Sequence, residues 1–302
     1  FQNSAHLFCQ TVDSGIVTRR TLINRLASLP DEASVTVSGW VDTVRDQKTI
    51  QFIVLHDETG AVQLVNRATR TSDESAPSDP EKLALTDTIS SLTAGSMVTV
   101  EGVLAHDERV KLSGLEIKIS ALTVESLSLP ELPIARDSSS DKRMDWRFID
   151  LRRPEARLIF QVQSELEHAM RSWWHERGFI EIHTPKLMAT ASESGAELFK
   201  LPYFETTAFL AQSPQFFKQM AQAAGFGQVF EIGPAFRADP SFTARHATEF
   251  TSVDMEVSWI ASHHEVMDMH EQLLTYAILQ VVEKYGGRLT EAFGVQLEPP
   301  KT

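Results

Sequence analysis

The sequence predicts an α+β protein of two domains, because two hydrophobic periods follow one another along its 302 residues. Up to residue 128, apolar residues recur at every second position in short runs, which is the period of a β-strand. From Pro154 onward they recur first at helical spacing and then in a mixture of helical and strand-like segments. Such a mixture without regular βαβ alternation favours an antiparallel sheet with helices packed on it. The length also exceeds that of a typical single domain.

Strand-like runs dominate the first domain, which we place at residues 1–128. Two of these runs follow a polar stretch, 71–82, that we interpret as a loop. The five runs are 35–41, 50–55, 61–65, 97–103 and 115–119. Five short strands with one long interruption favour a small Greek-key barrel such as the OB-fold, although the spacing alone also fits a β-sandwich.

A stretch rich in Pro, Ser and Asp separates the two domains, and we interpret 129–153 as a hinge. The second domain, 154–302, opens with a predicted helix. The apolar face of that helix consists of Ala156, Ile159, Phe160, Val162, Leu166, Ala169, Met170 and Trp173. Further strands are predicted at 207–211, 229–232 and 250–259, and further helices at 215–224 and 264–285.

Composition narrows the possible functions. A net charge of -13 argues against nonspecific binding to nucleic acid, since that affinity comes from lysine and arginine. The single cysteine, Cys9, excludes an internal disulfide and a multi-cysteine zinc site. No apolar run approaches the roughly 20 residues of a membrane span, and the first residues do not form a secretory signal. A cytoplasmic location is therefore predicted.

Residues able to carry chemistry concentrate between positions 190 and 256, although the common nucleotide-binding and hydrolase signatures are absent from the sequence. Arg237, at a strand end, can grip a phosphate bidentately. A following strand offers an aromatic ring and two carboxylates on one face, through Phe250, Ser252, Asp254 and Glu256. Taken singly, each has a simpler interpretation, since a helical lysine such as Lys218 is usually solvated. The residues alone indicate a site for phosphates and cations.

In order and spacing, these residues resemble the class II aminoacyl-tRNA synthetases of the aspartate, asparagine and lysine subgroup. Gly178–Pro185 resembles motif 1, the dimer-forming segment of that family, and Phe230–Glu256 resembles motif 2 with a loop of full length. The resemblance implies an OB-fold in the first domain and part of a class II antiparallel sheet, flanked by helices, in the second. It also implies ATP as a substrate, Mg²⁺, a tRNA partner and a homodimer.

Within the subgroup, Gln212–Gln219 is similar to the aspartate enzymes. A buried lysine there can pair with the side-chain carboxylate of aspartate, whereas asparagine offers it no charge. The resemblance thus implies an aspartate-tRNA ligase, which activates L-aspartate with ATP and transfers it to tRNA(Asp). Charging of tRNA(Asn) as well stays open. The short loop 243–246, with no insertion after Phe250, resembles the archaeal and eukaryotic type.

The resemblance also assigns roles to individual residues. Arg237 would be catalytic, holding the α-phosphate and the reacting carboxylate. The aspartate-binding residues would be Glu193, Gln215, Lys218 and Asp254. The ATP-binding residues would be Arg237, Asp239, Arg245, His246 and Phe250. In the barrel, Phe52 would stack on an anticodon base, with Arg45 and Gln63 beside it, although a strand phenylalanine alone is more often a core residue.

Some features depart from the family pattern. The family usually has Glu at Asp239 and a second Gly at Ser194. The sequence stops at Thr302, before motif 3 and before the acidic residues expected to bind Mg²⁺, so we predict no metal ligand within it and expect the chain alone to be an inactive fragment. Three alternatives stay open: a non-catalytic synthetase-like tRNA-binding protein, an asparagine-specific enzyme, and a single-strand-binding OB protein with a dimerisation domain.

Overall fold

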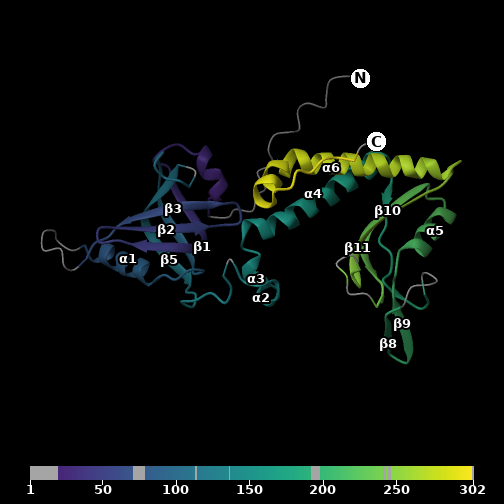
Figure 1. Ribbon diagram of the computed structural model, residues 1–302, viewed down its shortest axis with the longest axis horizontal. Coiled ribbons are helices and arrows are strands. Elements are labelled where there is room, and N and C mark those ends of the chain that lie inside the picture. Colours follow the sequence, from purple (N-terminus) through teal and green to yellow (C-terminus); the bar gives the residue numbers. More distant parts are fainter. Residues whose placement is uncertain are drawn as a thin grey trace, which may run out of the picture. The chain divides into compact units, whose positions relative to one another are not determined.

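The computed structural model describes residues 20–70, 79–112, 114–135, 137–191, 198–240, 243 and 246–300. The chain divides into two compact units between Pro154 and Glu155 (Figure 1). Within the described ranges, no helix is both long enough and apolar enough to cross a bilayer.

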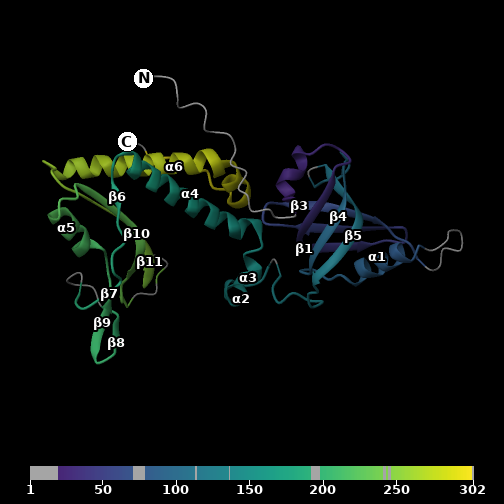
Figure 2. The same ribbon diagram turned by 180° about the vertical axis from the view of Figure 1, so that it is seen from behind.

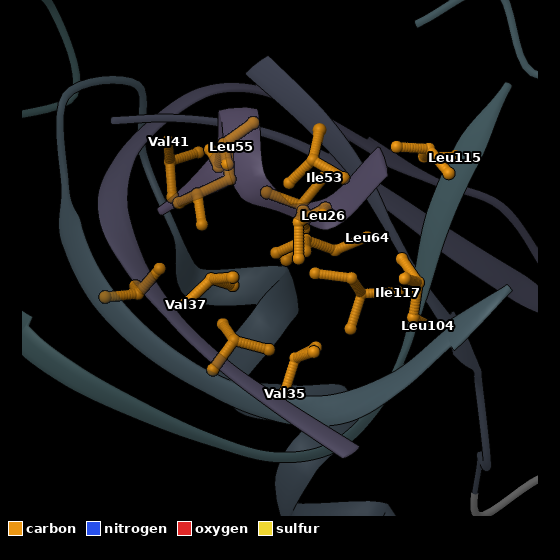
Figure 3. Close-up of a cluster of buried hydrophobic side chains, with 14 of the residues drawn as sticks. Leu26, Val35, Val37, Val41, Ile53, Leu55, Leu64, Leu104, Leu115 and Ile117 are labelled. Atoms are coloured by element: carbon orange, nitrogen blue, oxygen red, sulfur yellow. The ribbon is translucent and has the colours of Figure 1, made fainter. Parts of the chain in front are cut away.

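The first unit contains a closed barrel, with strands in the order β1-β2-β3-β5-β4. The strands are β1 (Ser34–Asp46), β2 (Ile50–His56), β3 (Ala61–Arg67), β4 (Met97–His106) and β5 (Leu115–Ser126). Closure confirms the predicted barrel over the sandwich. Alternate residues of each strand fill the interior, where Val37, Ile53, Leu64 and Ile117 point toward one another (Figure 3). Leu26 joins them from a short 3₁₀ helix, η1 (Ile23–Ser28).

Glycine allows neighbouring barrel strands to approach closely, most of all at Gly39. A Cβ atom on Gly39 of β1 would lie 2.1 Å from the carbonyl oxygen of His56 on β2. Any other residue there would push the two strands apart, so the sequence needs glycine at this position.

The interruption between β3 and β4 contains a helix, α1 (Pro80–Ser91). Our interpretation of 71–82 as a loop was therefore wrong at its C-terminal end. Asp79 caps the helix by accepting a hydrogen bond from the Glu81 N–H (3.1 Å), and Pro80 occupies the first turn. Only Thr86 and Ile89 of the helix are buried, so it has almost no apolar stripe for periodicity to detect. Two short helices, α2 (Ser140–Asp145) and α3 (Arg147–Asp150), lie within the predicted hinge.

In the second unit a three-stranded sheet, in the order β11-β10-β6, lies against two long helices. The elements are α4 (Pro154–Glu176), β6 (Ile180–Glu181), β7 (Leu187–Met188), β8 (Lys200–Tyr203), β9 (Thr206–Leu210), α5 (Gln215–Ala223), β10 (Gln228–Phe236), β11 (Glu249–Val257) and α6 (His263–Phe293). Strands β10 and β11 pair in antiparallel fashion, and β6 pairs with β10 in parallel. Helices α4 and α6 lie side by side in both views (Figures 1 and 2). The predicted α+β class is confirmed.

Helix α4 contributes to the core mainly through its C-terminal half. Trp173 and Trp174 are buried, and Trp174 stacks on Phe230 of β10 with ring centroids 4.4 Å apart. The predicted apolar face was wrong near its start, because Ile159 and Phe160 are 53% and 50% exposed. Ala156 is buried as predicted, and Leu158, which the predicted face did not include, is 2% exposed, so the buried side of the first turns is rotated away from Ile159 and Phe160. A β7-β9-β8 sheet, of which only β9 was predicted, completes the unit among its described residues.

Candidate functional site

Polar side chains of the second unit gather on one face of the β10–β11 ladder. Glu231 pairs with Asp254 in the register, and these side chains share a face because directly opposite residues do. Phe230 and Met255 pair on the other face and pack in the core with α4 and α6. This alternation places Phe250, Ser252, Asp254 and Glu256 on the polar face, as the sequence predicts.

Lys218 of α5 lies at the centre of this face and is only 2% exposed. Its Nζ lies 3.2 Å from Asp254 Oδ1 and 3.3 Å from Glu256 Oε2, and it donates to the Met255 carbonyl oxygen at 3.1 Å. Gln215 Nε2 donates to the same Glu256 carboxylate (3.2 Å). The solvated-lysine interpretation is thereby excluded. Lysine is buried only when its charge is paired, and here three acceptors surround it.

One ammonium and two carboxylates give this cluster a charge of -1. Ser252 Oγ also donates to Asp254, which keeps that carboxylate fixed against the sheet. A group of purely negative charge would be repelled by Asp254 and Glu256, while a purely positive group would be repelled by Lys218. The arrangement suits a ligand that carries both charges, such as an amino acid whose ammonium meets the carboxylates and whose acidic group meets Lys218.

Arg237 follows β10 and lies beside Phe250 of the neighbouring strand. Its guanidinium carbon is 5.5 Å from the Phe250 ring centroid, within the range of a cation–π contact. The Arg237 N–H donates to the Thr248 carbonyl oxygen (3.0 Å), closing the base of the loop that connects the strands. Both side chains are half-buried, so a planar group could reach the ring and the guanidinium together.

The loop between β10 and β11 borders a cavity of about 630 Å³. His246 is exposed there, with Nδ1 2.6 Å from Thr243 Oγ1, and Asp239 is half-buried. The cavity lining consists of Phe199, Ala238, Asp239, Thr243, His246, Ala247, Thr248 and Glu249. Two further predicted site residues, Glu193 and Arg245, lie outside the described residues.

Another cavity, of about 590 Å³, lies among α4, α6 and β11. Its lining is mainly apolar and includes Met170, Trp174, Met267 and Leu273. Such a surface suits packing against protein better than it suits a charged ligand. We therefore place the candidate site on the polar face of the ladder.

Sequence reasoning missed a second buried ion pair on that face. Glu231 is 3% exposed and accepts hydrogen bonds from the Thr184 N–H (3.0 Å), Thr184 Oγ1 (2.7 Å) and Lys186 Nζ (2.8 Å). The carboxylate ties the segment after β6 to the sheet. A glutamate inside the apolar run of β10 was the available signal, because a charge in such a run needs a partner.

The first unit presents a separate candidate face on the outside of the barrel. Phe52 is half-buried there, while its neighbours Gln51 and Ile53 point inward. Arg45 pairs with Phe52 across β1 and β2, and its guanidinium carbon is 5.8 Å from the ring centroid. Phe52 is therefore not a core residue. Gln63, one strand further, also faces outward.

A fourth residue of this outer face was not predicted. Glu116 of β5 pairs with Gln63 and accepts a hydrogen bond from its Nε2 at 3.3 Å. A cation, an aromatic ring, an amide and a carboxylate thus lie along adjacent strands. This combination can stack on a base and hydrogen-bond to its edge. Strand β5 joins β3 only through a parallel pairing distant in sequence, so no local pattern could place Glu116 there.

Comparison with known families covers both units. Residues 35–126 match an OB-fold nucleic acid binding domain, and residues 139–298 match the class II tRNA synthetases for D, K and N. The latter match spans more than half of the chain. The chain belongs to the class II tRNA synthetase family. This family uses ATP, which agrees with a cavity beside the motif 2 loop.

Similar curated synthetases are named for aspartate. The aspartate–tRNA(Asp/Asn) ligase of Methanopyrus kandleri is 42% identical over 84% of this chain and 57% of its own length. The aspartate–tRNA(Asp) ligase of Thermococcus kodakarensis is 41% identical over 88% of this chain and 59% of its own length. The chain therefore spans somewhat more than half the length of these curated relatives.

Solved synthetase structures have a similar fold, but they are named for different substrate amino acids. Asparaginyl-tRNA synthetase from Pyrococcus horikoshii has a TM-score of 0.80 at 29% identity, covering 90% of this chain and 60% of its own. A putative aspartyl-tRNA synthetase from Leishmania major has a TM-score of 0.79 at 28% identity, covering 94% and 57%. Fold likeness does not separate the two amino acids, so that choice depends on the site.

Proposed function

We propose that this chain belongs to an aspartate-tRNA ligase, which activates L-aspartate with ATP and transfers it to the 3′ end of tRNA(Asp). The observation that carries the proposal is the buried Lys218 with its two carboxylate partners. Residues 1–128 would bind the anticodon, 129–153 would form a hinge, and 154–302 would contribute motifs 1 and 2 of the catalytic domain. A cytoplasmic location and tRNA(Asn) as a second acceptor stay predictions.

Charge supports aspartate over asparagine. Lys218 Nζ, which now faces Asp254, Glu256 and the Met255 carbonyl, could exchange one of these acceptors for the side-chain carboxylate of aspartate, and Asp254 would then meet the substrate ammonium. Asparagine would leave the buried ammonium facing a neutral amide, which costs affinity. Gln215 is held against Glu256 and would complete the pocket, together with Glu193.

Arg237 would act on the reacting atoms. In the first step an α-carboxylate oxygen of aspartate attacks the α-phosphorus of ATP, and the bond to the departing pyrophosphate breaks. Negative charge grows on the phosphoryl oxygens, and the guanidinium of Arg237, which lies beside the Phe250 ring, would stabilise that charge. The step needs no protein nucleophile. Phe250 would stack on adenine, with Asp239, Arg245 and His246 around the nucleotide.

A hydroxyl at the tRNA 3′ end would then attack the aspartyl carbonyl, and AMP would leave. Mg²⁺ would screen the phosphates of bound ATP. The described residues contain no group of three or more His, Cys, Asp or Glu side chains able to hold a metal ion, so no step here is routed through the metal.

The proposal includes a homodimer formed through the motif 1 segment. Ile180 of β6 is 49% exposed, and Ile159 and Phe160 of α4 are half exposed. A second copy that covered these apolar side chains would explain why α4 has apolar residues outside the core of its own unit. The motif 1 segment is also tied to the polar face through Glu231 and Thr184.

The test is aspartate-dependent exchange of pyrophosphate with ATP, measured on the full product of the gene. Lys218→Met keeps the length of the side chain and removes its charge, while Lys200→Met on exposed β8 serves as a matched control. We expect exchange with aspartate but not asparagine, at least about a hundredfold lower in Lys218→Met and unchanged in the control. Exchange with asparagine alone would overturn the amino-acid assignment. Absence of exchange with either would leave tRNA binding as the function.

A further inference from the structure

Gln51 is a fully buried polar residue in a barrel whose interior is otherwise mostly aliphatic. Its Oε1 accepts a hydrogen bond from Asn66 Nδ2 at 2.8 Å. Its Nε2 donates to the Thr86 carbonyl oxygen and to Ser90 Oγ, both at 3.0 Å. One amide therefore joins β2 to β3 and to helix α1.

The network continues from Gln51 to the surface. The Ser90 hydroxyl donates to Asp46 Oδ2 (2.7 Å) at the end of β1, and Arg70 pairs with the same carboxylate. These contacts hold the pKa of Asp46 below its ordinary value, with the Ser90 hydrogen bond as the main cause. Three strands and a helix are thus connected through side chains around a single position.

The register gives this network a consequence on the outer face. Asp46 pairs with Gln51, and Gln51 pairs with Asn66, forming one row across β1, β2 and β3. The next row consists of Arg45, Phe52 and Val65. Adjacent rows point to opposite faces, so fixing the network row fixes the backbone that carries Arg45 and Phe52.

A purely stabilising role would not require a glutamine at this position. Apolar residues of similar volume would fill the interior without the cost of removing an amide from water. A satisfied polar network instead selects one geometry, because each donor and acceptor must meet its partner. The contacts around Gln51 therefore favour a role in positioning the neighbouring row, which contains Arg45 and Phe52.

We propose that Gln51 is a positioning residue that, through Asn66 and Ser90, holds Arg45 and Phe52 in the geometry required to bind a base of single-stranded RNA. The inference rests on the proposed anticodon-binding function of the barrel and specifies which buried residues set its geometry. Preorganised stacking groups bind more tightly because less ordering occurs on association.

The test uses the 302-residue chain and a short RNA stem-loop carrying the anticodon for aspartate codons. Gln51→Met removes the amide at similar length but leaves Asn66 without this acceptor, so it should weaken RNA binding about tenfold and also lower the melting temperature. Gln51→Met with Asn66→Leu removes both members of the Gln51–Asn66 hydrogen bond, which commonly restores stability, and the Thr86 carbonyl keeps its hydrogen bond from Ser90 Oγ. We expect the melting temperature to recover in the double variant while RNA affinity stays reduced.

Helix α1 offers a milder pair of variants that should fold normally. Ser90→Ala cuts the link to Asp46, whereas Ser91→Ala alters the adjacent exposed serine, whose hydroxyl donates only within the helix. We expect about a threefold loss of RNA affinity for Ser90→Ala and none for Ser91→Ala. Amide hydrogen exchange at Arg45 and Phe52 should be faster in Ser90→Ala and Gln51→Met, without RNA present.

The outcomes distinguish failure of the positioning role of Gln51 from failure of the proposed anticodon binding. If the unaltered chain fails to bind the stem-loop, the anticodon-binding proposal fails and the positioning role fails with it. If the chain binds but the double variant regains full affinity together with stability, Gln51 only stabilises the barrel. Equal affinity of Gln51→Met and the unaltered chain would likewise overturn the positioning role alone.

Discussion

The barrel and the second unit bury different kinds of side chain around their candidate sites. Inside the barrel the packed residues are mainly aliphatic, and Phe52 and Arg45 lie on the opposite, outer face. In the second unit two charged residues of the polar face are themselves buried, with Lys218 and Glu231 at 2% and 3% exposure. If the proposed sites are correct, strand alternation separates folding from binding in the barrel, whereas in the second unit Lys218 would serve both.

This difference predicts where substitutions affect stability. In the barrel, large effects should come from the interior and small ones from the outer face. In the second unit, replacing a charged site residue should destabilise the fold, because its partner would stay buried without compensation.

The largest effect is expected in the barrel interior. Leu64→Ala removes a fully buried side chain and should lower the free energy of unfolding by about 4 kcal/mol, through lost burial and the cavity left behind. Val65→Ala, on the outer face of the same strand, should cost less than about 1 kcal/mol. Denaturant unfolding followed by circular dichroism measures both. Equal losses would mean that the two faces of β3 are packed alike.

A charged residue should matter almost as much in the second unit. Glu231→Gln leaves Lys186 and the Thr184 N–H facing an amide instead of a carboxylate, and should cost about 3 kcal/mol. Glu249→Gln, on the exposed end of β11, is the matched control and should change stability by less than about 0.5 kcal/mol. A small loss for Glu231→Gln, measured in the same unfolding assay, would show that the ion pair does not hold the ladder.

The same contrast explains what sequence reasoning could find. Strand alternation placed Phe250, Ser252, Asp254 and Glu256 on one face and defined the five barrel strands, because both depend on neighbours along the chain. The partners of Lys218 and Glu231 lie 36 and 45 residues away in sequence, so no local pattern identifies them, although the apolar run of β10 indicates that Glu231 needs one. Helix α1 was not predicted for another reason. It buries only Thr86 and Ile89, so it has almost no apolar stripe.

Phe52 provides a sharper test of the separation of folding and binding in the barrel. Phe52→Leu should leave stability within about 1 kcal/mol, because the ring lies on the outer face, yet weaken stem-loop RNA binding at least tenfold through lost stacking on a base. Phe226→Leu, an exposed aromatic in the second unit, should change neither quantity. A loss of stability equal to the loss of binding would remove the distinction between the two faces.

The smallest effect should come from an exposed ion pair on the barrel, for comparison with the buried pairs of the second unit. Arg109 Nε and Nη2 bind Asp107 at 2.9 and 2.7 Å, and the guanidinium, with the Arg109 backbone N–H, lowers the pKa of Asp107 to about 2. A folded pKa below the unfolded value of about 3.9 means that the pair stabilises the fold above that pH and stops doing so as the pH falls through about 2.

Arg109→Ala should raise the pKa of Asp107 part of the way back, because the backbone N–H still donates, with Arg25→Ala as the control. The variant and the unaltered chain should differ slightly in stability at neutral pH and converge near pH 2. A carboxyl titration by NMR measures the pKa directly, and an unchanged value in Arg109→Ala would assign the whole effect to the backbone.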